Sequence, residues 1–307
     1  MRLPLAALLL LVAGAVAPNE AWSQAQLRVF ACVPEWASLS QELGGDKVTT
    51  SLGAGPLQDP DEIEVKPVLL RAVREANLVV CTGPLEASWL PNLLRRAGNV
   101  NVRPGTPGYF AAADYVKMMA VPKQPGQKLD AHSSGHPHIQ TDPRNIRAVA
   151  VQLGRRLAEI DPPNAAVYNQ RTRAFVDKLD QAVKRWEEQA APLKGINVIA
   201  QHDDLNYLLV WLGVNQVANV ELTPGQAPPP AHLAKIIDLI PAQKVRFLIN
   251  GAFEDPKSMT YVAERAKVPL ATLSFTVGGN SAATDLFTLF DDMIGRMLQA
   301  AQGAGRS

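Results

Sequence analysis

Three of the five histidines in this chain of 307 residues lie within a stretch of seven residues. They are His132, His136 and His138, in the segment LDAHSSGHPHIQTDP. Neutral imidazole is a common ligand of zinc and other transition metals, so this spacing is compatible with a metal site. A solvated loop of biased composition would show the same pattern. The segment alone therefore leaves both interpretations open.

A fourth histidine, His202, has a more informative position. It directly follows the apolar stretch INVIAQ, which is predicted to be a β-strand. In open parallel sheets, ligands bind outside the carboxyl ends of the strands, so this side chain is expected in such a crevice. Asp203 and Asp204 follow it as turn or capping residues, and either could accept a hydrogen bond from the His202 ring and orient it.

Strands and helices are predicted to alternate in both halves of the chain. In the first half we expect strands at 27–33, 47–52 and 77–83 and helices at 34–43, 66–75 and 87–97. In the second half we expect strands at 195–201, 245–250 and 269–275 and helices at 206–212, 231–239, 258–267 and 283–300. This alternation predicts an α/β fold with parallel sheets covered by helices on both faces.

Two helices with clear start signals are predicted between the halves. Asp142-Pro143 and Asp161-Pro162 each combine a capping side chain with a proline suited to the first turn. The second helix is expected from about Pro162 to Gln189, and ~28 residues would span ~42 Å. Such a helix would bridge two lobes. We therefore divide the chain into a signal peptide (1–25), an N-terminal lobe (26–140), linker helices (141–191) and a C-terminal lobe (192–307).

The N-terminus has the pattern of a secretory signal peptide. Arg2 precedes an apolar run from Leu3 to Ala17, which is shorter than the ~20 residues of a membrane span. Small residues allow cleavage after Ser23 or Ala25, and without a nearby cysteine no lipid attachment is expected. A formal net charge of +1 gives no reason to expect nucleic acid as a partner. These features predict an exported, periplasmic protein.

The chain has two cysteines, Cys32 and Cys81, and each ends an apolar run. An oxidising compartment allows thiols to pair. If the two strands are parallel neighbours, the cysteines could form a disulfide, although adjacent strands are not ideal for one. Two buried free thiols are the alternative.

Six segments of the chain, in this order, resemble one family of transport proteins: ELGGDKV, LQDPDEIEVKP, ANLVVCTGPLEASWLPNLL, GHPHIQTDPRN, QHDDLNYLLVWLG and VELTPGQAPPPAHLAKIIDLI. The family is that of the periplasmic solute-binding proteins of zinc or manganese ABC importers. The resemblance covers nearly all of the chain after the signal peptide. It implies two α/β lobes that are joined by a long rigid helix and enclose a metal cleft.

The resemblance also implies a set of metal ligands. His138 matches the histidine of the N-P-H motif, His202 matches that of the H-D motif, and Asp61 stands where the family has its first histidine. The family's last ligand, an acidic residue after the final strand, has no counterpart in ATLSFTVGGNSAATD before Asp285. Two imidazoles and a carboxylate suit zinc, and the hard carboxylate oxygen moves the preference somewhat towards manganese.

The fourth donor is left open between water, His132, His136 and Glu62. Because Pro137 favours an extended backbone before it, His136 and His138 could face one ion together. However, His136 replaces an asparagine of the family motif, so both His136 and His132 are expected to be solvated loop residues.

The expected function is capture of a divalent metal, most readily zinc, and its delivery to a membrane ABC permease by a monomeric binding protein. A metallochaperone, or a binder of a metal complex or small ligand, is the alternative. A metallohydrolase with Glu62 as base is less favoured, because the sequence contains no H-E-x-x-H, no nucleophile elbow and no phosphate loop.

Overall fold

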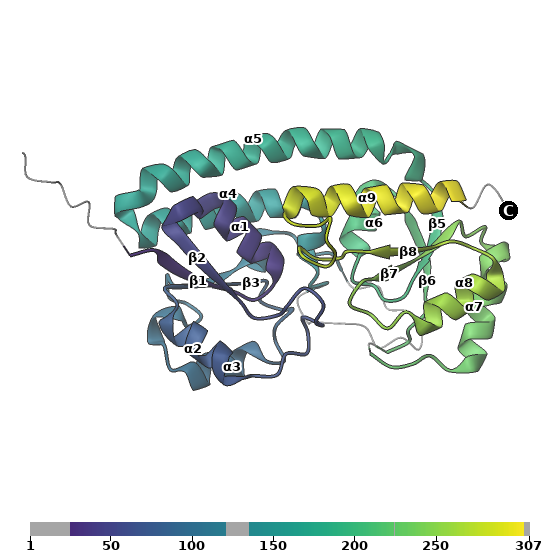
Figure 1. Cartoon of the computed structure of the whole chain (residues 1–307), viewed down its shortest axis with the longest axis horizontal. Coiled ribbons are helices and arrows are strands. Elements are labelled where there is room, and N and C mark those ends of the chain that lie inside the picture. The colour runs from purple at the N-terminus through teal and green to yellow at the C-terminus, as the bar shows by residue number, and fades with distance from the viewer. Residues whose placement is uncertain (1–24, 121–134, 224, 304–307) are drawn as a thin grey trace, which may run out of the picture.

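The structure is a computed structural model that describes residues 25–120, 135–223 and 225–303. These residues form two lobes, each built on a parallel sheet of four strands (Figure 1). The predicted signal peptide and His132 lie outside the described residues. The two-lobed α/β architecture confirms the predicted fold.

The first lobe has the strand order β2-β1-β3-β4. Its strands are β1 (Leu27–Ala31), β2 (Val48–Leu52), β3 (Leu78–Cys81) and β4 (Tyr109–Ala111). Its helices are α1 (Pro34–Gly44), α2 (Pro67–Glu75) and α3 (Leu90–Ala97). Each of these helices has a proline in its first turn, where the missing N–H costs no hydrogen bond.

The second lobe repeats this topology with the order β6-β5-β7-β8. Its strands are β5 (Asn197–Ala200), β6 (Asn215–Asn219), β7 (Phe247–Gly251) and β8 (Leu270–Leu273). Its helices are α6 (Asn206–Leu212), α7 (Pro230–Ala242), α8 (Lys257–Ala266) and α9 (Leu286–Gly303). In both sheets the first strand of the lobe is central, so its carboxyl end lies at the middle of the sheet edge.

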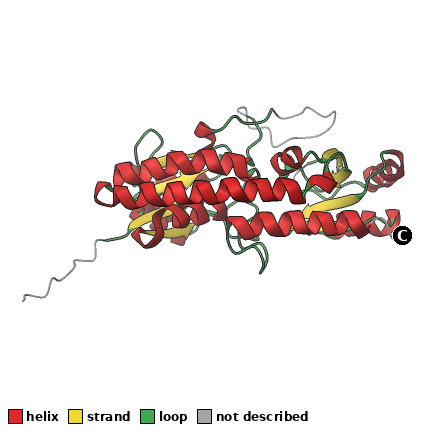
Figure 2. Cartoon of the chain, turned by 90° about the horizontal axis from the view of Figure 1, so that it is seen from above, coloured by secondary structure: helices red, strands yellow, loops and turns green. Residues whose placement is uncertain are grey.

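Two long helices connect the lobes, α4 (Pro143–Ile160) and α5 (Ala165–Gln189). Asp142 caps α4 as predicted, because its side chain accepts a hydrogen bond from the Arg144 amide. The 25 residues of α5 run past both lobes, and α9 lies alongside (Figures 1 and 2). The start predicted for α5 at Pro162 is wrong, since residues 162–164 form a separate 3-10 turn. The domain boundaries themselves remain a prediction.

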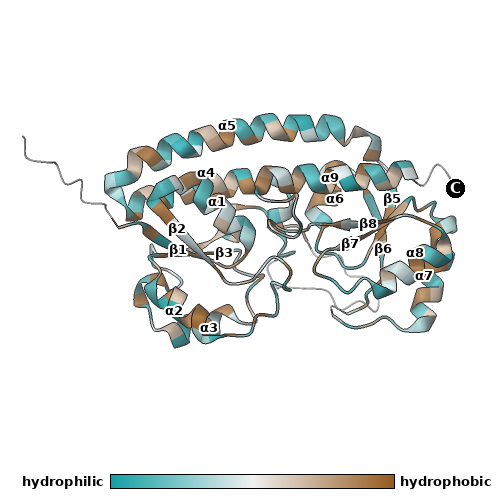
Figure 3. Ribbon diagram, viewed as in Figure 1, coloured by the Kyte–Doolittle hydropathy of each residue, from teal (hydrophilic) through white to brown (hydrophobic). Residues whose placement is uncertain are grey.

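Aromatic packing fixes α5 against the second lobe. The ring of Trp186 on α5 lies 5.1 Å from Phe290 on α9 and 6.3 Å from Trp211 on α6. Figure 3 shows hydrophilic and hydrophobic stretches along α5, as expected for a helix with one buried face. A single cluster of buried apolar residues extends through both lobes and the connecting helices. None of the described helices combines the length and the apolarity that a bilayer crossing requires.

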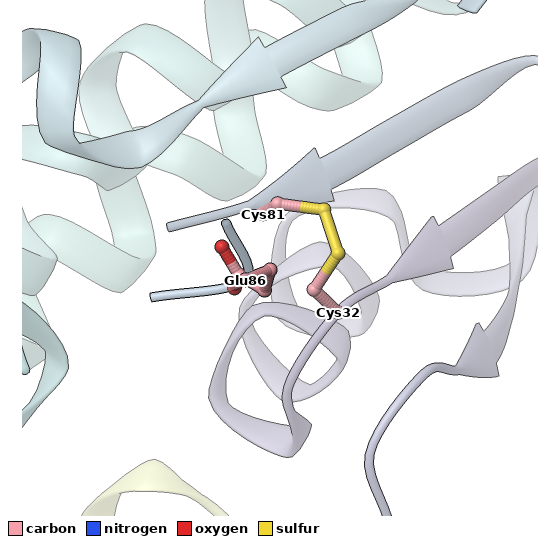
Figure 4. A group of neighbouring side chains, drawn as sticks. All are labelled: Cys32, Cys81 and Glu86. Carbon is pink, nitrogen blue, oxygen red and sulfur yellow. A yellow bond between two sulfur atoms is a disulfide. The ribbon is translucent and has the colours of Figure 1, made fainter. Parts of the chain in front are cut away.

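The two cysteines form a disulfide at the carboxyl ends of β1 and β3 (Figure 4). Cys32 and Cys81 are fully buried, and their Cα atoms lie 4.8 Å apart. The two strands are parallel neighbours, which was the condition for pairing. Glu86 lies beside the disulfide and accepts hydrogen bonds from the Thr82 and Gly83 amides.

Candidate metal centre

One cleft brings the three predicted ligands together. Asp61 from the first lobe, His138 from the segment before α4, and His202 from the second lobe all line the same cavity of about 450 Å³. They come from three segments that are far apart in the sequence. The shared cavity is the geometric condition for binding one ion between the lobes.

His138 is held by the turn that leads into α4. Its carbonyl oxygen accepts hydrogen bonds from the amide and the hydroxyl of Thr141, at 3.2 and 3.0 Å. The side chain is 2% exposed, and its ring packs edge-on against Phe275 with 6.0 Å between centroids. The backbone position of His138 is therefore fixed from the linker, while its ring contacts the second lobe.

His202 is the second residue after β5, at the carboxyl end of the strand where the sequence predicted it. Its Nδ1 atom is 3.3 Å from a carboxylate oxygen of Asp203. A carboxylate at one ring nitrogen fixes the tautomer and leaves the other nitrogen to bind a metal. This contact makes Asp203 a candidate for the orienting role that the sequence left open between Asp203 and Asp204.

The second oxygen of Asp203 faces His136, whose Nε2 atom lies 3.5 Å away. Burial acts to raise the pKa of Asp203, but contact with His136 and the charges of His202, His136 and His138 outweigh it and lower the pKa to about 2. Asp203 thus stays ionised between two imidazoles, one from the segment before α4 and one from the second lobe.

The expectation that His136 is a solvated loop residue is wrong. Its side chain is 1% exposed, because the segment is tied down on both sides. The His136 amide donates to the Met119 carbonyl at 2.9 Å, and its own carbonyl accepts from the Tyr207 hydroxyl at 3.0 Å. In the described structure His136 contacts Asp203 and does not line the cleft. A sequence contains no signal for this burial, which depends on residues 17 and 71 positions away.

Asp61 lies in the loop after β2, which is pinned to the start of α3. The Trp89 indole donates to the Pro60 carbonyl at 2.9 Å, and the Ser88 hydroxyl donates to the Asp61 carbonyl. The Asp61 amide donates to the Asp59 side chain at 2.9 Å. Glu62, considered as a donor or a base, is exposed and does not line the cleft.

The loop after β8 holds Thr276 near the position where the resemblance implied an acidic ligand. Phe275 before it has a left-handed backbone (φ 62°), which is strained for a residue with a side chain.

Glu35, at the start of α1, is 1% exposed. Burial raises the pKa of Glu35 to about 7, against the opposing effects of Thr276 and its own backbone amide. Glu35 was not among the predicted site residues, although an acidic residue within the apolar stretch CVPEWA was a usable signal.

The cleft is strongly acidic. Six carboxylates line it, those of Asp59, Asp61, Asp204, Glu221, Glu254 and Asp255. The one lysine in the lining, Lys257, already pairs with Asp255 at 3.0 Å. This imbalance favours a cation over an anionic ligand.

Comparison with known proteins identifies the family. The model of the family "ZnuA: Zinc-uptake complex component A periplasmic" matches residues 29–300. The chain belongs to this ZnuA family. The match includes all three predicted ligands and both sheets.

Known relatives of the ZnuA family fit this assignment. The zinc-binding lipoprotein AdcA of Streptococcus pneumoniae is 22% identical over 75% of this chain, which spans only 46% of AdcA. The manganese ABC transporter substrate-binding lipoprotein PsaA of the same species is 23% identical over 87% of this chain and 86% of PsaA. A crystal structure of ZnuA is 21% identical, with a TM-score of 0.76 over 90% of this chain and all of that one. This last likeness shows the shared fold.

Proposed function

We propose that this chain is the periplasmic binding component of an ABC uptake system for a divalent transition metal, with zinc as the preferred cargo and manganese as the second. The observation that carries the proposal is the convergence of Asp61, His138 and His202 on one acidic cleft between two lobes. Membership of the ZnuA family and the similarity to the zinc-binding lipoprotein AdcA and the manganese transporter protein PsaA support it.

The donor set determines how the cargo would be held. Two imidazole nitrogens and one carboxylate oxygen provide three of the four ligands typical of zinc, and water or a further side chain completes the set. Asp203 lies 3.3 Å from Nδ1 of His202 and would help to orient the ring. Since the donors belong to both lobes, the ion would tie the lobes together when it binds.

Export, delivery to a membrane permease and a monomeric state complete the proposal. The signal-peptide pattern at residues 1–25 and the family's periplasmic description support export. For delivery, the lobes must release the ion. Release is easier when the protein supplies only three of the four ligands than when it supplies all four. A transport role also accounts for the cleft without requiring any catalytic step.

The size of the cleft supports one alternative cargo. A cavity of about 450 Å³ is much larger than a bare ion, so a small metal complex could also fit. A binder of such a complex, or a metallochaperone, would use the same three donors. Metal-chelate competition separates these functions, because a binder of complexes keeps its affinity when the ion is already chelated.

Titration calorimetry with zinc tests the proposed function. We expect submicromolar binding of one zinc ion by the metal-free protein. His202→Ala and His138→Ala should each weaken it by more than the ~10–100-fold typical of losing an outer partner. The matched control is His232→Ala, since His232 does not line the cleft. Affinities weaker than ~µM for both zinc and manganese would reject high-affinity uptake.

A further inference from the structure

The second lobe carries oxygen donors at the ends of three adjacent strands. Gln201 directly follows β5, Glu221 follows β6, and Glu254 follows β7. These strands are neighbours in the order β6-β5-β7, so the three side chains lie along one edge of the sheet. All three line the cleft, and Asp59 of the first lobe lines it too. None of these four residues is among the predicted zinc ligands.

Gln201 has an unused oxygen inside this group. The side chain is 2% exposed, and its amide nitrogen donates to a Glu221 carboxylate oxygen at 2.9 Å and to the Asp255 carbonyl at 3.3 Å. Both partners are acceptors, which fixes the amide orientation. The Oε1 atom then has no hydrogen-bond partner among the described residues. Leaving a buried oxygen unsatisfied costs about 1–3 kcal/mol, so a ligand at this atom would be favourable.

Backbone amides position the carboxyl groups of Glu221 and Glu254. The Gly225 amide donates to Glu221 at 3.2 Å, and the Gly251 amide donates to Glu254. Burial raises the pKa of Glu254 to about 8, and the charges of Glu221 and Asp59 add to this effect. Carboxylates in such proximity need a cation or a proton to relieve their repulsion.

We propose that Glu221, Glu254 and the Oε1 atom of Gln201, with Asp59 facing them from the first lobe, form a second cation subsite for a hard divalent ion of the calcium class. The donors are all oxygens, which calcium prefers, whereas the zinc position contains two imidazoles. A cation there would neutralise the acidic wall and satisfy Gln201. It would also join the lobes through Asp59. The subsite does not depend on the proposed function, because it uses none of the three zinc ligands.

The test is titration of calcium chloride into the zinc-loaded full chain by calorimetry, with magnesium chloride as a second arm. We expect one calcium ion per chain, bound more tightly than magnesium. Glu221→Gln and Glu254→Gln should each weaken calcium binding at least ~10-fold, as expected for loss of a charged donor. Glu264→Gln is the matched control, since Glu264 is exposed on α8 and outside the cleft.

Three results would overturn the subsite. One is absence of calcium binding to the wild-type chain, which would leave a shared proton as the means of relieving the repulsion. Another is calcium binding that both glutamate variants retain. The third is calcium binding that His202→Ala removes, which would place the ion at the zinc position. If one glutamate variant does not fold, calcium binding by the other glutamate variant and by His202→Ala gives the same decision. Calcium binding without zinc binding would reject the proposed function alone.

Discussion

At the scale of single residues, one carboxylate lies between two of the imidazoles near the candidate site. Asp203 lies between His136 and His202, at 3.5 and 3.3 Å from their ring nitrogens. It therefore links the segment before α4 to the second lobe. The resemblance to the N-P-H motif implies an asparagine at the position of His136, whereas this chain has a second imidazole facing Asp203.

Asp203→Asn should weaken zinc binding by ~10–100-fold without abolishing it, because the His202 ring loses the charge that orients it. Competition with a fluorescent zinc chelator would measure the change. Asp114→Asn, at an exposed position of the first lobe, is the control. Unchanged zinc affinity in Asp203→Asn would show that the carboxylate only supports the fold.

Glu35 is expected to make stability depend on pH. Its pKa is raised from 4.5 to about 7 in the folded chain, so the folded state binds this proton more tightly than the unfolded state. The resulting stability is present below pH 4.5 and is lost as pH rises through about 7. The shift corresponds to roughly 3 kcal/mol in the free energy of unfolding.

Glu35→Gln removes this ionisation. The variant should therefore gain stability relative to the wild type between pH 5 and pH 8, as measured by urea unfolding of the metal-free protein at both values. A constant difference between the two proteins across this range would mean that Glu35 ionises normally. Glu264→Gln serves again as an exposed acidic control.

Only part of the site could be predicted from single residues. His202 is identified by its place after a strand, while Asp61 and His138 depend on the motif resemblance; that these residues bind the metal remains a prediction. The burial of His136 could not be predicted, because the groups that cover it come from distant segments. Tyr207, for example, lies 71 residues beyond His136.

At the scale of elements, the central strands were predictable and two outer strands were not. β1, β3, β5 and β7 consist mostly of apolar residues, as expected for buried parallel strands. β4 has only three residues, and β6 reads NQVAN, which has little apolar character. Both are edge strands with only one neighbouring strand. Fewer of their side chains need to be buried, so their sequences can be less apolar.

The disulfide is a stabilising link between two of these elements. It joins residues 49 positions apart at the ends of β1 and β3. A Cys32→Ala/Cys81→Ala double variant should lose about 2–4 kcal/mol in the free energy of unfolding, chiefly because its unfolded chain is less restricted. Urea unfolding with and without a dithiol reductant would measure this. The reductant should destabilise the wild type and leave the double variant unchanged; an equal effect on both would contradict the prediction.

At the scale of the whole molecule, the connecting helices and the shared core limit how far the lobes can separate. α5 contacts α1 of the first lobe and α9 of the second, and one cluster of buried apolar residues continues through both. Opening by a wide hinge would break this packing. Ion capture is therefore expected to involve small movements of the loops that carry Asp61, His138 and His202.

Continuous packing also predicts that zinc stabilises the molecule as one unit. At 100 times its dissociation constant, a ligand that binds only the folded state adds about 2.7 kcal/mol, which for a chain of this size raises the melting temperature by ~5 °C. We expect scanning calorimetry to show a single transition that moves with zinc at pH 7.5. The shift should shrink at pH 5, because protons compete with the metal for imidazole nitrogens, and it should vanish in His202→Ala. Two separate transitions, with zinc moving only one of them, would show that the lobes unfold independently and that the ion does not bridge them.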